Sequence, residues 1–160
     1  MPTQLDELGQ VDNWLTTGFK LSLRINSLRS RKRFFDVTKT PIAEEWQREY
    51  GQVVSDYANW EKSYESCSTL ATKYELMLPS LVGLNGVSDA STPSIQPNIL
   101  LGIFSSMRNT LGSTVHNTPS DLIDDPFGGP NLSDFFLRGT KFVDLIRTRL
   151  VWGENRGSQK

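Results

Sequence analysis

The stretch PIAEEWQREYGQVVSDYANWEKSYESCSTLATKYELMLP, residues 41–79, decides the fold. Its apolar side chains recur every three or four residues, which is the period of an α-helix, whereas a strand would repeat every two. Prolines stand only at its two ends, so the run predicts one long helix over about 41–78 with a single aromatic-rich face. The residues of that face are Ile42, Trp46, Tyr50, Val53, Tyr57, Trp60, Tyr64, Cys67, Ala71, Tyr74 and Leu78.

Both ends of this run carry signals that begin and end helices. Thr40 is a suitable N-cap, Pro41 has the fixed φ that suits a first turn, and two glutamates follow in that turn. Pro79 is the expected stop, and Gly51 the expected site of a kink. At about 1.5 Å per residue the helix would be roughly 55 Å long. A helix of that length needs neighbours along its whole apolar face.

The N-terminal part of the chain permits two interpretations. Leu5 to Leu15 have the spacing of a short helix, which Gly18 would end. Residues 19–37 fit either a small β-hairpin, because alternate residues from Phe19 to Ile25 are apolar, or a helix. If this segment is helical, three of its basic residues lie on one face: Lys20, Arg24 and Arg31.

The C-terminal half predicts two further helices between irregular connections. Pro97 opens a helix that ends at Gly112, and a last helix runs from Leu132 towards Trp152. Gly, Pro and Ser favour loops over residues 80–96 and 113–130. The apolar stripes of the two helices are Ile99, Leu100, Ile103, Phe104, Met107 and Leu111, and Leu132, Phe135, Phe142, Val143, Ile146 and Leu150.

These elements together predict a mainly all-α protein. It would be a helical bundle in which three or four shorter helices pack on the long helix, with the hairpin at 19–37 as an alternative. A chain of 160 residues fits one domain. We expect that domain to span residues 1–152 and to be followed by a polar C-terminal tail, residues 153–160.

Few residues suit catalysis or metal binding. His116 is the only histidine and Cys67 the only cysteine, and Cys67 falls on the apolar stripe, where a buried thiol is expected. The aspartates Asp121, Asp124 and Asp125 lack the spacing of a calcium loop, and Gly128 and Gly129 lack a phosphate-loop pattern. We therefore expect no enzyme activity, no metal site and no cofactor.

Charge is unevenly distributed along the chain, although its net value is only −1. Residues 19–39 hold seven basic residues and one acid, whereas residues 40–78 hold seven acids and three bases. Basic surfaces on an otherwise acidic protein are typical of contact with a polyanion. The candidate nucleic-acid-binding residues are Lys20, Arg24, Arg29, Arg31, Lys32, Arg33, Arg138, Lys141 and Arg149.

The same arginines have a second interpretation, because the acids of the long helix are available to pair with them. The aromatic face likewise fits either the core or a contact with another subunit, since Tyr and Trp each keep a polar atom. Core or interface packing is favoured over base stacking. The candidate partner-interface residues are Trp46, Tyr50, Tyr57, Trp60 and Tyr64.

Two functions follow as expectations. The first is a non-catalytic subunit of a ribonucleoprotein that binds the backbone of RNA or single-stranded DNA without reading sequence. This profile is similar, in fold and charge alone, to small helical subunits of RNA-guided effector complexes and to coat subunits of helical viruses. The second is a protein-interaction or assembly module without nucleic-acid contact. Other subunits, including copies of this chain, would be partners. No stretch is apolar enough for a membrane span, so a cytoplasmic location is favoured.

Overall fold

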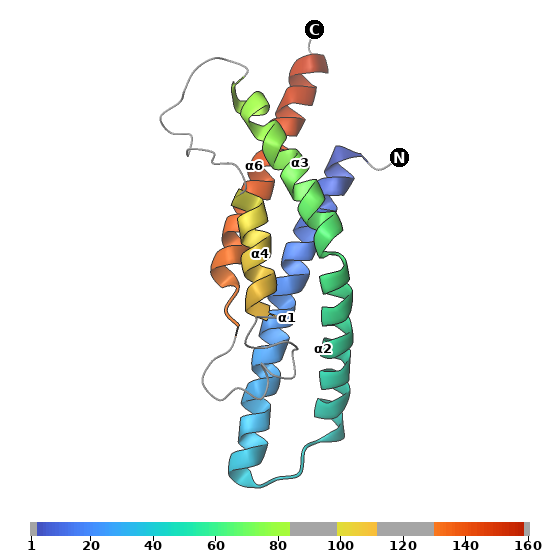
Figure 1. The fold of residues 1–160 in the computed structure, drawn as a ribbon, viewed down its shortest axis with the longest axis vertical. Coiled ribbons are helices and arrows are strands. Elements are labelled where there is room, and N and C mark those ends of the chain that lie inside the picture. Colours follow the sequence, from blue (N-terminus) through green and yellow to red (C-terminus); the bar gives the residue numbers. More distant parts are fainter. Residues whose placement is uncertain (1–2, 84–98, 112–129, 159–160) are drawn as a thin grey trace.

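Helices form every regular element in the part of the chain that the structure describes. The computed structural model describes residues 3–83, 99–111 and 130–158, with the backbone alone for 78–83 and 152–158. No strand occurs within these ranges. The helices, shown in Figure 1, are α1 (Gln4–Thr38), α2 (Glu44–Lys62), α3 (Tyr64–Gly83), α4 (Ile99–Leu111) and α6 (Ser133–Ser158).

The longest helix is α1, and it includes the segment for which we considered a hairpin. Residues 19–37 are helical throughout, so the hairpin alternative is wrong and Gly18 does not end a helix. The alternation from Phe19 to Ile25 is misleading, because Leu23 is 51% exposed. A helical stripe decides the outcome, since its buried members lie on one face of a helix: Leu8, Val11, Trp14, Leu15, Gly18, Leu21, Ile25 and Leu28.

The helix predicted over 41–78 is two helices that meet at Ser63. The backbone N–H of Ser63 donates to the carbonyl of Trp60 at 3.2 Å, which closes α2 with a tight turn. That carbonyl also accepts a hydrogen bond from Nε1 of Trp14 at 3.0 Å. A side chain that binds into the backbone ladder is a recognised cause of a helix break. The break therefore falls at Ser63, not at Gly51, and α3 continues through Pro79 to Gly83.

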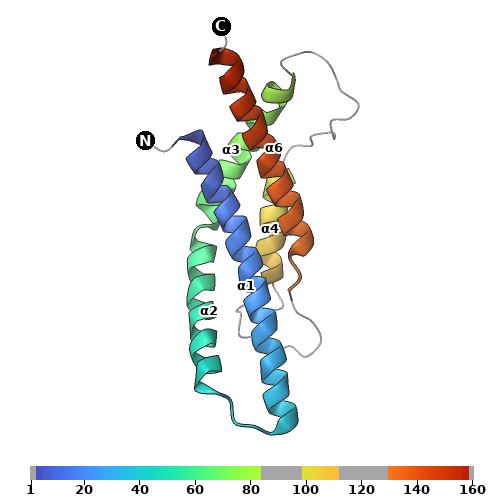
Figure 2. The same cartoon turned by 180° about the vertical axis from the view of Figure 1, so that it is seen from behind.

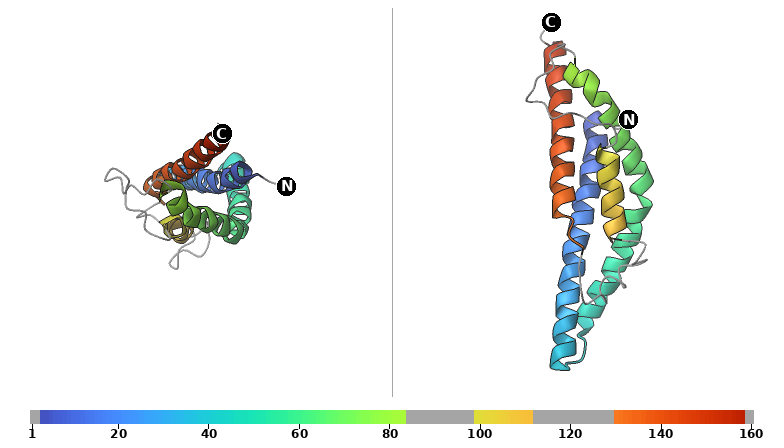
Figure 3. Two further views of the ribbon diagram at one scale, coloured as in Figure 1. Left: turned by 90° about the horizontal axis from the view of Figure 1, so that it is seen from above. Right: turned by 60° about the vertical axis from the view of Figure 1, so that its left-hand side comes forward.

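The helices form a body with a two-helix arm. In the body, α3, α4 and α6 surround the N-terminal half of α1 (Figures 1 and 3). Beyond the ends of α4 and α6, only α2 runs beside α1 among the described elements (Figure 2). The amide Nδ2 of Asn26 donates to the carbonyl of Pro130 at 2.9 Å, so the arm begins near Asn26. We call the part of α1 and α2 beyond this contact the arm.

The predicted stripes of the C-terminal helices are largely confirmed. Five of the six predicted residues of α4 are buried, and Ile99 is partly buried; the five are Leu100, Ile103, Phe104, Met107 and Leu111. In and before α6, Leu132, Val143, Ile146 and Leu150 are buried, whereas Phe135 and Phe142 are partly buried. The backbone of α6 remains helical to Ser158, so residues 153–158 of the predicted polar tail belong to this helix. The side chain of Trp152 and residues 84–96 and 112–129, which include His116, the three aspartates, Gly128 and Gly129, lie outside the described residues.

A buried carboxylate fixes the start of α4. Glu75 of α3 is 2% exposed, and its Oε1 accepts hydrogen bonds from the backbone N–H groups of Ile99 and Leu100, at 2.5 and 3.2 Å. The first N–H groups of a helix have no partner within that helix, so Glu75 supplies one from a distant element. Burial raises the pKa of Glu75, and the two backbone hydrogen bonds partly oppose this. A residue remote in sequence thus acts as the cap of α4.

Candidate functional site

Two basic residues of α1 pair with acids of α2. Nη1 of Arg24 lies 2.7 Å from Oδ2 of Asp56, and Arg31 pairs with Glu49 in the same way. The Arg24 guanidinium holds the pKa of Asp56 below its usual range, against the effect of partial burial. Lys20, Arg24 and Arg31 share one side of α1, as the helical interpretation predicts. Two of the three are occupied by the chain's own carboxylates.

The remaining candidates for nucleic-acid binding are divided between α1 and α6. Arg29 is 8% exposed, and Arg29, Lys32 and Arg33 each have an interaction within the chain. On α6, Arg138 lies over the ring of Phe135 at 5.2 Å, Lys141 is exposed and Arg149 is half-buried. Figure 2 shows α2 and α6 on opposite sides of α1. Helix α6 therefore does not share the α2-facing side on which Arg24 and Arg31 lie.

Three of the candidate interface aromatics are buried in the chain's own core. Trp46, Tyr57 and Trp60 are between 3% and 7% exposed. Nε1 of Trp46 donates to the carbonyl of Leu28 at 3.0 Å, which ties α2 to α1. These side chains already have partners inside the molecule, so we do not include them in a proposed interface.

The other two candidate aromatics are half-buried at the edge of the core. Tyr50 stacks on Trp46 with 5.4 Å between ring centroids. The hydroxyl of Tyr64 lies 3.0 Å from Oγ of Ser105, and the guanidinium of Arg108 covers its ring. No contact among the described residues joins the exposed parts of Tyr50 and Tyr64 into one surface. The thiol of Cys67 is buried, as expected, and burial raises its pKa.

A different surface is exposed on the solvent side of α1, from Leu23, just before the arm, to Val37 near its tip. Leu23 is 51% exposed, Phe34 62% and Val37 79%, and the intervening Ser27 and Ser30 are exposed as well. Large apolar side chains on a solvent-facing helix surface mark interaction sites when they are contiguous. We call this surface the α1 outer face: Leu23, Ser27, Ser30, Phe34 and Val37.

None of the site residues predicted from the sequence lies on this face, although the sequence contains a signal for it. Positions 23, 27, 30, 34 and 37 are four, three, four and three residues apart, which is helical spacing. Five arginines and lysines stand between these positions and two of the five positions are serine, so the stripe does not form an evident apolar pattern. The exposure of Phe34 and Val37 distinguishes this stripe from the buried one.

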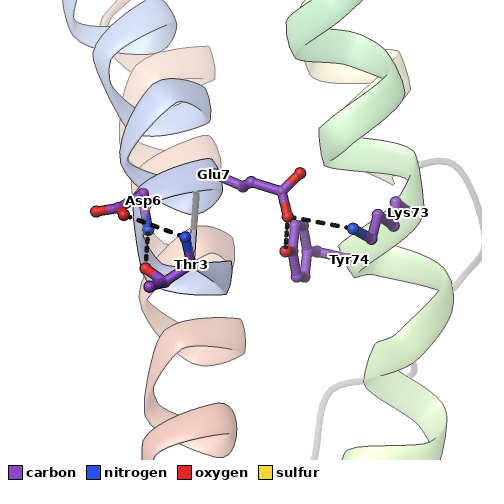
Figure 4. Close-up of polar contacts among 5 residues, drawn as sticks. All are labelled: Thr3, Asp6, Glu7, Lys73 and Tyr74. Carbon is purple, nitrogen blue, oxygen red and sulfur yellow. Dashed lines mark hydrogen bonds and ion pairs between the residues drawn. The ribbon is translucent and has the colours of Figure 1, made fainter. Parts of the chain in front are cut away.

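The N-terminal end of α1 carries a polar cluster that joins it to α3 (Figure 4). Thr3 and Asp6 form a capping box, with backbone-to-side-chain hydrogen bonds of 3.1 Å in each direction. Oε1 of Glu7 accepts hydrogen bonds from the hydroxyl of Tyr74 at 2.6 Å and from Nζ of Lys73 at 3.2 Å. These bonds lower the pKa of Glu7, whereas burial and the Glu7 carboxylate raise the pKa of Tyr74 to about 12.

We expect Glu7→Gln to reduce stability at neutral pH and to lose this effect in acid. The folded-state pKa of Glu7 lies below its ordinary value of 4.5, so its stabilising contribution is present above that value and disappears as the pH falls through the folded pKa. The measurement is urea unfolding of both proteins at about pH 7 and about pH 3. Glu65→Gln, at an exposed position on α3, is the control. A difference between wild type and Glu7→Gln that stays constant with pH would contradict the assignment.

Comparison with family models, with curated proteins and with solved structures finds no match for this chain. No helix in the described ranges is both long and apolar enough to cross a membrane. Within the same ranges, no group of three or more His, Cys, Asp or Glu side chains has the arrangement of a metal site.

Proposed function

We propose that this protein is a non-catalytic protein-interaction module that contributes to an assembly through the α1 outer face. The observation that carries the proposal is the exposure of Leu23, Phe34 and Val37 on one side of a helix whose other side is buried along the stripe from Leu8 to Leu28. An exposed apolar stripe on a protruding arm is costly in water unless a partner covers it. The core of an interface is depleted of charge, and this stripe is uncharged.

The ion pairs of α1 support this choice over nucleic-acid binding. Arg24 and Arg31 would have to leave Asp56 and Glu49 before they could bind phosphates. Carboxylates beside a cationic side chain also repel a polyanion. The sign and position of these acids favour a protein partner for this side of the arm.

Binding to a nucleic-acid backbone is the second candidate, and a specific observation favours it. Four of the nine predicted basic residues have exposed side chains: Lys20, Arg33, Arg138 and Lys141. Such contacts would be sequence-independent and would weaken steeply as salt rises. Neutralising Lys20 and Lys141 together should then flatten the salt dependence of binding to single-stranded RNA or DNA. An unchanged salt dependence would exclude these two residues as the contacts.

Photo-crosslinking tests the first candidate directly. The full chain, with benzoylphenylalanine in place of Phe34, is irradiated in cells that contain the protein naturally, and the adducts are identified by mass spectrometry. We expect protein adducts at position 34 and few at the control position Thr69, which is exposed on α3. Equal yields at the two positions, or none at 34, would contradict the interaction module. Adducts with nucleic acid at 34 would favour the second candidate.

A further inference from the structure

The α1 outer face has the pattern of one strand of a coiled coil. Its five positions alternate steps of four and three residues, as do the a and d positions of a heptad repeat. Charged residues make up 22% of the chain, yet none stands at these five positions. The face therefore fits an apolar helix that runs alongside it.

The side-chain sizes along this face are ordered so that the face can pack against a second, antiparallel copy of itself. Leu23 stands at one end, the small residues Ser27 and Ser30 in the middle, and Phe34 and Val37 at the other end. When two copies run antiparallel about a two-fold axis near Ser30, Phe34 and Val37 of one copy meet Ser27 and Leu23 of the other. Large side chains then face small or apolar ones, and interdigitation of this kind gives a packed interface.

The shape of the molecule allows this arrangement. The helices of the body cover α1 only up to about Asn26, where its side chain reaches Pro130, and the arm beyond carries α2 alone among the described elements (Figures 1 and 2). In an antiparallel pair of arms, Val37 near the tip of one arm lies beside Leu23, where the partner's body ends, and the two bodies lie at opposite ends of the pair. The outer face of α1 can thus be covered over its length without the two bodies meeting.

Charges beside the face are also self-complementary. The Arg31–Glu49 ion pair lies next to Ser30, so the two-fold axis brings this pair close to the same pair of the second copy. Each pair carries both signs, and the arginine of one copy can approach the carboxylate of the other. A partner with charges of one sign along its flank would be repelled by one member of each pair.

We propose that the partner of the α1 outer face is a second copy of this chain, bound antiparallel through the two arms. This inference rests on the proposed interaction function and names its partner. The contact runs over about 22 Å of helix, at 1.5 Å per residue from Leu23 to Val37. Contacts of this size lie at the small end of specific interfaces, so the dimer is weak and is populated at about 100 µM and above.

Crosslinking between two single-cysteine variants tests both the contact and its direction. Leu23→Cys and Val37→Cys are prepared in a Cys67→Ala background, since Cys67 is the only native thiol. A short bis-maleimide should join the two variants when they are mixed, and should join neither variant to itself. In the antiparallel pair the two copies of position 23 are about 21 Å apart, again at 1.5 Å per residue. Self-crosslinking of each variant alone would indicate a parallel pair and overturn the proposal.

Sedimentation equilibrium is the second measurement, and it distinguishes failure of the self-pairing from failure of the proposed interaction function. Wild type should reach dimer mass as its concentration rises, Phe34→Glu should remain monomeric, and Thr69→Glu, on exposed α3 surface, should behave as wild type. Circular dichroism confirms that each variant is folded. Monomer at every concentration overturns the self-pairing. If protein adducts at position 34 persist in cells in that case, the interaction module survives with another partner; if they too are absent, both proposals fail.

Discussion

Trp60→Ala is expected to lower the free energy of unfolding by about 3–5 kcal/mol, the range found when large aromatic residues are removed from cores. Trp60 is 3% exposed and stacks on Trp14 with 4.2 Å between ring centroids. Two hydrogen bonds also join these tryptophans of α1 and α2, each from one indole to the backbone carbonyl of the other tryptophan. Nε1 of Trp60 donates to the carbonyl of Trp14 at 2.8 Å, and Nε1 of Trp14 donates to the carbonyl of Trp60 at 3.0 Å. The substitution removes the stacking and one of these hydrogen bonds, and leaves a cavity.

Chemical denaturation followed by circular dichroism measures this loss without relying on tryptophan fluorescence. Phe34→Ala at low protein concentration is the matched control, because Phe34 is 62% exposed and its removal from a monomer should change stability by less than about 0.5 kcal/mol. Trp60→Phe, which keeps an aromatic ring but loses the donor, should lie between the two. If Trp60→Ala were no more harmful than Phe34→Ala, the tryptophan pair would not be part of the core.

The fold class could be predicted from the spacing of apolar residues, because that spacing stays helical wherever one helix ends and the next begins. Val53, Tyr57, Cys67, Ala71 and Tyr74 all fall on the predicted face and are all buried. The break at Ser63 has no signal in that spacing. At this break the Trp60 carbonyl accepts a hydrogen bond from Trp14, a residue 46 positions away. A contact between residues so far apart cannot be predicted from the local sequence.

The full length of α1 is not evident from the local sequence for a related reason. Glycine lowers helix propensity, so Gly18 indicated a stop, but tertiary packing outweighs a cost of about 1 kcal/mol. Alternating apolar residues after Gly18 then favoured a strand. The buried stripe of α1 continues across both features, from Val11 through Gly18 to Ile25. Continuity of a stripe is thus better evidence than a single residue that breaks helices.

Whether the basic residues are available to bind phosphate depends on which acids the fold places beside them. Composition shows that residues 19–39 are basic and residues 40–78 acidic. It does not show that α1 and α2 run side by side, with Asp56 and Glu49 within reach of Arg24 and Arg31. Once paired, the arginines lose much of their attraction for phosphate. The uncharged face between them was visible only when the exposure of Phe34 and Val37 was known.

Gly18→Ala is expected to destabilise the protein by about 1–3 kcal/mol, although alanine is the better helix former. A Cβ atom on Gly18 would lie 2.8 Å from Cζ2 and 3.1 Å from Cε2 of Trp60, and 3.0 Å from Cε of Met107. Met107 can move the end of its flexible side chain, but the indole of Trp60 is held by its stacking and its hydrogen bonds with Trp14. The absence of a side chain at position 18 is therefore what lets α2 approach α1 closely.

Gly51→Ala separates this packing effect from intrinsic helix propensity. An added Cβ at Gly51, on α2, meets nothing within 4 Å, so this variant should gain about 1 kcal/mol of stability from the same exchange of residues. The two variants should thus shift the denaturation midpoint in opposite directions from wild type. A rise in stability for both would mean that Trp60 moves aside at little cost, which would also weaken the case for a rigid tryptophan pair. A fall for Gly18→Ala alone would show that the close approach of α1 and α2 depends on the missing Cβ, and with it the geometry that aligns the arm.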